Sequence, residues 1–225
     1  MQKFETPALI STVLDIPAGR VQFIAADRTD TTVEIRPVNA TKRRDVKAAE
    51  EIEVAYLDGV LRIEAPAAKN QYFGPSGSIE VTVQLPAGSH VEAKAGSAEL
   101  RGVGRLGNVA FDGAYGTDSA IKLDEAASVR LVAHAGDVSV GRLGGPSEIS
   151  TGKGDITIAE AMGGAVVLTT QMGDVSVGAA HGVSASLDAG TNHGRIDNAL
   201  MNADGTAGLA IRATTSHGDI TARSL

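Results

Sequence analysis

The chain has 225 residues, enough for one large domain or two small ones, and its 43% hydrophobic and 21% charged residues are typical of a folded chain, not a disordered one. Since 27 acidic residues outnumber 20 basic ones, giving a net charge of -7, and only 3% of residues are aromatic, a nucleic-acid partner is not expected. The absence of cysteine excludes disulfides, thiolate metal sites and cysteine nucleophiles.

The first 86 residues predict an antiparallel β-sheet with little helix. Their apolar and β-branched segments are short and are bounded by turn sequences such as Pro17-Ala18-Gly19 and Asp58-Gly59. Only residues 42–49 have the composition of a helical turn or two. The predicted strands cover residues 12–16, 20–25, 31–36, 50–57, 60–64 and 78–85.

From about residue 87 the chain becomes rich in Gly, Ala, Ser and Asp and repeats one unit, for example TGKGDITI at residues 151–158. Apolar residues alternate with polar ones before and after a central glycine, and this period of two predicts two short strands in each copy. The central glycines of seven copies are spaced 20, 20, 18, 19, 21 and 24 residues apart. These marker glycines are Gly96, Gly116, Gly136, Gly154, Gly173, Gly194 and Gly218.

A pair of short strands cannot bury its apolar side alone, so successive copies are expected to stack on one another. The predicted fold is therefore all-β: residues 87–225 form a single-stranded parallel β-helix, or β-solenoid, with a right-handed path by the general rule for crossovers between parallel strands. The antiparallel sheet of residues 1–86 is expected to cap it, because an open solenoid end exposes unpaired strand edges. No linker separates the two parts, which predicts a single domain over residues 1–225.

The recurring Gly-Asp-(Ile/Val)-x-(Ile/Val) unit resembles that of a bacterial family named putative adhesins, which are β-strand-repeat domains of unknown function. The sequences LDIPAG at residues 14–19 and LPAG at residues 85–88 also look like that family's lead-in. The resemblance implies a repetitive β-fold without an established set of catalytic residues. For some relatives it also implies a link to membranes and to envelope-stress responses.

Four aspartates that directly follow marker glycines are a candidate site. If the copies stack in register, their carboxylates form a row that could bind a cation or a glycan, or act as acid and base in a polysaccharide-active enzyme. The structural alternative is that each carboxylate accepts a backbone N–H within its turn. The four residues are Asp137, Asp155, Asp174 and Asp219.

Two further features could form a site. The adjacent aromatic residues Tyr72 and Phe73 could anchor a partner protein or cover the end of the solenoid. His193 and His217 lie just before marker glycines and could be neighbours, but a metal site needs three or four converging ligands, so neither a metal nor a cofactor is predicted. A row of threonines is expected to bond to the turn backbone, namely Thr151, Thr170, Thr191 and Thr215.

No nucleophile elbow, Walker loop, dinucleotide fingerprint or zinc motif occurs, so the chain is not expected to be an enzyme. The predicted function is an adhesin-like scaffold that binds an unidentified protein partner, with the polysaccharide-active or cation-binding alternative left open. The last repeat strand, residues 219–225, is expected to be an open edge through which a second copy could pair. Without a signal sequence or 18 consecutive apolar residues, the protein is expected in the cytoplasm, with no direct membrane insertion.

Overall fold

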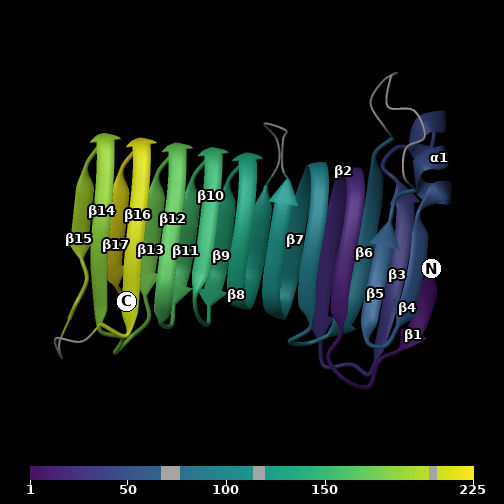
Figure 1. Ribbon diagram of the computed structural model, residues 1–225, viewed down its shortest axis with the longest axis horizontal. Helices are drawn as coiled ribbons and strands as arrows, with labels where there is room; N and C mark the ends of the chain where they lie inside the picture. The colour runs from purple at the N-terminus through teal and green to yellow at the C-terminus, as the bar shows by residue number, and fades with distance from the viewer. Residues whose placement is uncertain (67–76, 114–119, 203–206) are drawn as a thin grey trace.

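The computed structural model describes residues 1–66, 77–113, 120–202 and 207–225, and the described chain is almost entirely β-strand (Figure 1). The one helix among the described residues is α1 (Arg43–Glu51). The strands are β1 (Gln2–Glu5), β2 (Ser11–Ala26), β3 (Asp30–Pro37), β4 (Glu53–Leu57), β5 (Val60–Glu64), β6 (Ile79–Pro86), β7 (His90–Gly113), β8 (Ile121–Ala135), β9 (Val138–Leu143), β10 (Ser147–Lys153), β11 (Ile156–Ala161), β12 (Gly164–Met172), β13 (Val175–Ala179), β14 (Ala185–His193), β15 (Ile196–Ala199), β16 (Leu209–His217) and β17 (Ile220–Ser224).

Each coil of the molecule places one strand on each of two faces, which we call face A and face B. Face A, toward the viewer in Figure 1, contains β10, β12, β14 and β16, and face B contains β9, β11, β13, β15 and β17. The long strands β2, β7 and β8 bend from face A to face B or the reverse, so that each contributes to both. Neighbouring coils pair in parallel, and the predicted stacking of the glycine-marked copies is confirmed.

From β7 to β13 the coils follow the sequence order, and beyond β13 they do not. Face A continues from β12 to β16 and then to β14, and face B continues from β13 to β17 and then to β15. The coil that comes last in the sequence therefore lies between two coils that precede it. The expectation that residues 219–225 form an open edge was wrong, because β17 is paired on both sides, with β13 and with β15.

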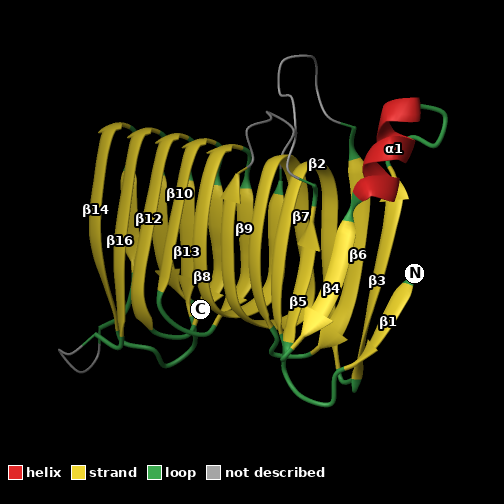
Figure 2. Ribbon diagram, turned by 45° about the vertical axis from the view of Figure 1, so that its right-hand side comes forward, coloured by secondary structure: helices red, strands yellow, loops and turns green. Residues whose placement is uncertain are grey.

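The N-terminal part is not the purely antiparallel sheet that the sequence predicted. β2 pairs in parallel with β5, β6 and β7, so it is a coil of the solenoid, and the antiparallel pairs are β1–β3, β3–β6 and β4–β5 (Figure 2). The physical reason lies at Pro17-Ala18-Gly19, which turns the chain from face A to face B within β2 and does not reverse it into a hairpin. A Cβ on Gly19 would lie only 1.8 Å from the carbonyl oxygen of Ile79, so this corner needs glycine.

A single hydrophobic cluster fills the space between the faces. Inward-pointing residues at equivalent positions of successive coils are aligned, as Leu131, Ile149 and Leu168 are on face A. On face B, Ile156 and Ile158 are aligned with Val175 and Val177 of the next coil, and their exposed fractions are 0% and 1%. Burying a side chain of this size contributes about 1.5–3 kcal/mol relative to leaving it exposed, so the aligned rows hold the coils together.

The helix α1 lies at the N-terminal end of the solenoid, against β3 and β6 (Figure 2). It begins one residue later than predicted and runs two residues further, into the segment 50–57 that was expected to be strand. Its buried Asp45 accepts hydrogen bonds from the backbone N–H groups of Asn39 at 3.2 Å and Ser78 at 3.0 Å. This carboxylate therefore joins the helix to the residues before it and to the start of β6.

Candidate functional site

The marker glycines form a row at the corner where the chain passes from face A to face B. A Cβ on Gly154 would lie 2.2 Å from the carbonyl oxygen of Gly136, and one on Gly173 would lie 2.1 Å from that of Gly154. Gly154 also has a φ of +140°, which L-residues rarely adopt. The row continues through Gly218 to Gly194, while Gly116 lies outside the described residues. Glycine recurs because the coils approach too closely at this corner for any side chain.

The four candidate aspartates lie beside this row and each bonds to the next coil. The Oδ1 atom of Asp137 accepts the N–H of Asp155 at 2.9 Å, and that of Asp155 accepts the N–H of Asp174 at 2.8 Å. Asp174 accepts the N–H of Asp219 at 2.7 Å, and Asp219 accepts that of Arg195 at 2.8 Å. The structural alternative, in which each carboxylate accepts a backbone N–H, was right about the donor group. The donating N–H belongs to the neighbouring coil, however, and not to the same turn.

The row ends at Arg195, where the next aspartate would be. Its guanidinium lies 3.2 Å from Oδ2 of Asp219. The hydrogen bond from the backbone N–H of Arg195, and next the one from its side chain, hold the pKa of Asp219 below its usual range. Because the described coils end here, a carboxylate at position 195 would have no further N–H to accept, and a cation is the better residue.

The threonine row behaves as expected. The hydroxyl of Thr170 donates to the carbonyl oxygen of Gly154 at 3.0 Å, and that of Thr215 donates to Gly173 at 3.0 Å. Thr151 and Thr191 make the equivalent bonds to the marker glycines of their neighbouring coils. Thr170 and Thr215 are buried, so these hydroxyls satisfy carbonyls that face the interior of the corner.

The aspartate row thus has a complete structural role. Within the part of the chain that the structure describes, no group of three His, Cys, Asp or Glu residues is arranged to hold a metal ion. Use of Asp137, Asp155, Asp174 and Asp219 by a cation, a glycan or a polysaccharide-active enzyme stays a prediction. Tyr72 and Phe73 lie outside the described residues, so their role as a partner anchor also stays a prediction.

The outside of face A has a groove that the sequence did not predict. It has a volume of about 530 Å³ and crosses β2, β7, β8, β10 and β12. Small side chains, among them Ala110, Ser128 and Ala165, leave room along its length. The sequence contains these small residues, but their alignment depends on the register between coils, which no spacing in the sequence specifies.

Polar groups follow one side of the groove. The backbone N–H of Asn108 donates to Nδ1 of His90 at 2.9 Å, and Ser128 donates to the side-chain oxygen of Asn108 at 2.9 Å. These three side chains come from successive coils and fix one another in place. Thr12 also lines the groove, and its buried Oγ1 has no hydrogen-bond partner among the described residues.

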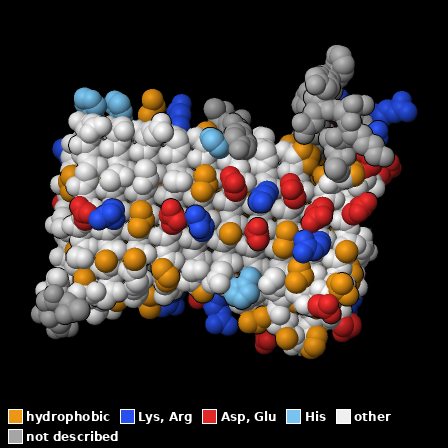
Figure 3. Space-filling model, in the orientation of Figure 1, with side chains coloured by type: hydrophobic (Ala, Val, Ile, Leu, Met, Phe, Trp, Pro, Cys, Tyr) orange, Lys and Arg blue, Asp and Glu red, His pale blue; other side chains and the backbone are white. Residues whose placement is uncertain are grey.

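Charged residues of alternating sign follow the other side. Glu92, Arg130 and Glu148 line the groove, and Nε of Arg130 lies 3.7 Å from Oε2 of Glu148. The same row continues beyond the groove to Arg212 and Asp188, which are 3.1 Å apart. Figure 3 shows acidic and basic side chains alternating along the middle of face A. Face A is therefore flat, carries charges of both signs and is crossed by a largely apolar groove.

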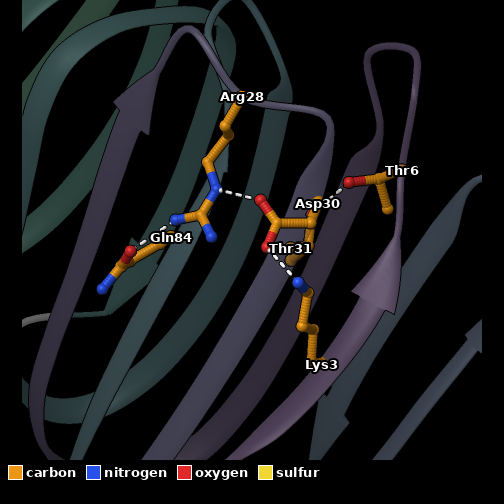
Figure 4. A network of polar contacts seen from close by, with 6 residues as sticks. All are labelled: Lys3, Thr6, Arg28, Asp30, Thr31 and Gln84. Atoms are coloured by element: carbon orange, nitrogen blue, oxygen red, sulfur yellow. Dashed lines mark hydrogen bonds and ion pairs between the residues drawn. The ribbon is translucent and has the colours of Figure 1, made fainter.

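A second polar network joins the N-terminal strands (Figure 4). Asp30 lies 2.9 Å from Nε of Arg28 and 3.1 Å from Nζ of Lys3, and Arg28 also bonds to Gln84. The hydrogen bond from Arg28, and next that from Lys3, lower the pKa of Asp30 to about 2. This network connects β1, β3 and β6 at the end of the solenoid. Its charged side chains, Lys3, Arg28 and Asp30, form ion pairs with one another.

The open edge of the described solenoid is formed by β14 and β15, which pair on one side only, with β16 and β17. The inward-pointing residues of this last coil are less well covered, and Ile196 is 47% exposed. If two copies pair edge to edge, the edge is therefore Ala185–His193 with Ile196–Ala199, and not residues 219–225 as the sequence predicted. No helix of the described chain is long and apolar enough to cross a membrane.

Solved structures that match this chain include proteins named putative adhesins. A putative adhesin from Parabacteroides distasonis ATCC 8503 is 16% identical and has a TM-score of 0.54, over 98% of this chain and 95% of that one. A putative adhesin from Bacteroides fragilis NCTC 9343 is 15% identical with a TM-score of 0.43, over 100% and 95% of the two chains. A putative lipid binding protein from Parabacteroides distasonis is 12% identical with a TM-score of 0.47, over 98% and 95%.

At 16% identity, the likeness to the Parabacteroides distasonis adhesin shows the fold alone. A comparison with curated proteins gave no match. The family model of the Toastrack domain, DUF4097, matches residues 13–224, which span the solenoid from β2 to β17. The chain therefore belongs to the Toastrack family, a bacterial β-strand-repeat family of unknown function.

Proposed function

We propose that this Toastrack domain is a non-catalytic protein-binding module, and that the groove on face A binds an extended segment of a partner protein. The groove carries the proposal, because it is a continuous concave site on a rigid scaffold. Proteins usually bind their ligands at concave, mostly apolar sites that carry a few fixed polar groups. An adhesive role is also what the name of the similar Parabacteroides distasonis protein describes.

The dimensions of the groove suit an extended peptide. The lining residues come from six consecutive strand segments of face A, two of them from β7, and they run from Ser11 in the first to Ala165 in the last. At about 4.8 Å between neighbouring strands, the groove is about 24 Å long. An extended peptide rises about 3.3 Å per residue, so roughly seven residues would occupy it.

The chemistry of the walls defines the partner segment. Small residues at the floor leave room for apolar side chains, and the fixed polar atoms of Asn108 and Ser128 offer hydrogen bonds to a backbone. The charges of Glu92, Arg130 and Glu148 alternate, so a segment that carries residues of both signs fits better than a strongly acidic or basic one. The expected occupant is therefore a short extended segment with alternating apolar and charged residues.

A random peptide library displayed on phage tests this proposal. The intact domain should enrich peptides with alternating apolar and charged residues, and Ala110→Arg, which fills the groove, should lose them. Ala159→Arg is the matched control, since Ala159 is exposed on face B, away from the groove. Enrichment of the same peptides by both variants, or failure to enrich any peptide, would overturn the proposal.

Three further parts of the proposal concern the scaffold and its setting. The solenoid path is right-handed, in keeping with the general preference of parallel crossovers. The antiparallel strands β1, β3 and β4 cap its N-terminal end and protect it from edge pairing. Location in the cytoplasm and a link to envelope stress stay predictions.

A further inference from the structure

A row of three potential metal ligands lies at the corner of the solenoid just before the marker glycines. Met172 on β12, His217 on β16 and His193 on β14 occupy the same position in three adjacent strands. The rings of His193 and His217 are stacked, with centroids 4.8 Å apart and planes inclined by 25°. All three side chains are exposed, and Figure 3 shows histidines side by side at this corner of the molecule.

We propose that Met172, His217 and His193 form a surface site for monovalent copper. Bonds from a metal to imidazole nitrogen are about 2.0 Å long, so one ion can join two nitrogens that are up to about 4 Å apart. The two stacked rings come from neighbouring strands and reach that separation by rotation of their exposed side chains. Met172 is the neighbour of His217 on the other side, so its thioether can supply the third ligand.

The set of donor atoms selects the metal. A thioether is a soft ligand that favours Cu(I), and imidazole also binds copper well. The row itself contains no carboxylate, the ligand type that hard divalent ions prefer. Its next member after Met172 is Lys153, whose positive charge opposes a divalent ion more strongly than a monovalent one.

The charged groups beside the site belong to the turn row and have contacts of their own. The nearest aspartates of the turn row, Asp174 and Asp219, accept backbone N–H groups from the next coil. Arg195 is paired with Asp219 at 3.2 Å. The two imidazoles and the thioether are the donors of the row that suit Cu(I), and Met172 keeps 55% of its surface exposed to solvent.

Titration of the intact domain with Cu(I) alone, kept reduced with ascorbate and in competition with a chromophoric Cu(I) chelator, tests the site. One ion per chain is expected. Removing a direct ligand by His217→Gln should weaken Cu(I) binding by about tenfold or more, as should His193→Gln. His181→Gln is the matched control, because His181 is an exposed histidine outside the row and should bind as the unchanged chain does.

The thioether is tested separately by Met172→Leu, which keeps the size and apolar character of the side chain. This variant should bind Cu(I) more weakly and Zn(II) as before. Cu(I) is diamagnetic, so NMR of methyl-labelled methionine should show the Met172 signal moving and the signals of the exposed Met162 and Met201 unchanged. Equal Cu(I) binding by His217→Gln and the unchanged chain, tighter binding of Zn(II) than Cu(I), or a stationary Met172 signal would each overturn the proposal.

Discussion

Arg195 ends the aspartate row by binding Asp219 twice. Its backbone N–H donates to Oδ1 at 2.8 Å, and its guanidinium lies 3.2 Å from Oδ2. In the preceding coils the same position is aspartate, whose carboxylate accepts an N–H from the next coil. The exchange of aspartate for arginine therefore marks the last coil in space, although this coil is not the last in the sequence.

Replacement of Arg195 by alanine should raise the pKa of Asp219 without bringing it to the usual value of about 3.9, because the backbone N–H bond remains. The pKa of Asp219 is lower in the folded chain than in the unfolded chain. The ionised carboxylate therefore stabilises the fold at neutral pH, and this stabilisation is lost as the pH falls below the unfolded-state pKa and through the folded-state pKa. NMR titration of the carboxyl carbon measures the pKa, and thermal unfolding measures the stability.

The stability difference between Arg195→Ala and the unchanged chain should accordingly shrink as the pH falls below the usual aspartate value. Arg212→Ala is a suitable control, since Arg212 pairs with Asp188 through its side chain alone and leaves Asp219 untouched. An unchanged Asp219 pKa in Arg195→Ala would contradict the role assigned to this pair.

The order of the last two coils can be tested with engineered disulfides, which are easy to interpret because the chain has no cysteine. Thr169 and Thr214 are neighbours, with hydroxyl oxygens 3.2 Å apart. Thr169→Cys with Thr214→Cys should therefore cross-link on oxidation, since adjacent strands lie within the Cα distance that a disulfide allows. Thr169→Cys with Gly190→Cys should not, because β16 separates these strands. Efficient cross-linking of the second pair would show that the coils follow the sequence order.

The close approach at the marker glycines predicts a large effect for Gly154→Ala. The new Cβ would lie 2.2 Å from the carbonyl oxygen of Gly136, at a φ of +140°, so the free energy of unfolding should fall by more than about 1 kcal/mol. Gly190→Ala is the matched control, since its Cβ would have nothing within 4 Å. Because alanine suits a strand better than glycine, this control should be up to about 1 kcal/mol more stable. Chemical denaturation measures both, and equal effects would refute the steric argument.

Two buried threonines should respond in opposite ways to the same substitution. Thr12 has no partner for its buried hydroxyl in the described chain, so Thr12→Val should raise the free energy of unfolding by about 1 kcal/mol. The hydroxyl of Thr170 donates to Gly154, so Thr170→Val should lower it by about 0.5–1.5 kcal/mol. Urea denaturation distinguishes the two signs. Destabilisation by Thr12→Val would show that this hydroxyl has a partner in solution.

Much of the fold could be predicted from the sequence because glycine, threonine and aspartate each have a structural role that recurs from coil to coil: close approach at the corner for glycine, and hydrogen bonds to backbone groups for threonine and aspartate. The stacking of Gly136, Gly154 and Gly173, the threonine row and the contact of His193 with His217 follow from this repetition. The parallel pairing of β2 could not be predicted, because Pro17-Ala18-Gly19 suits a hairpin as well as a corner between faces.

The sequence indicates the interchange of the last two coils only weakly. Arg195 in place of aspartate is one indication, and Asn198 at an inward position is another, since it aligns with the buried Ala222 of the neighbouring coil. Both suit a terminal coil and fit poorly inside a stack. The groove could not be predicted at all, because it arises from residues of six strand segments whose alignment is known only once the coils are in register.

The position of β16 and β17 between earlier coils has a consequence for biosynthesis. Residues 185–199 cannot reach their native partners until Leu209–Ser224 have left the ribosome, because those partners are β16 and β17. Most of the solenoid can form coil by coil as the chain emerges. Its far end must instead wait for the final segment to enter, so translation has to pass residue 224 before that end can close.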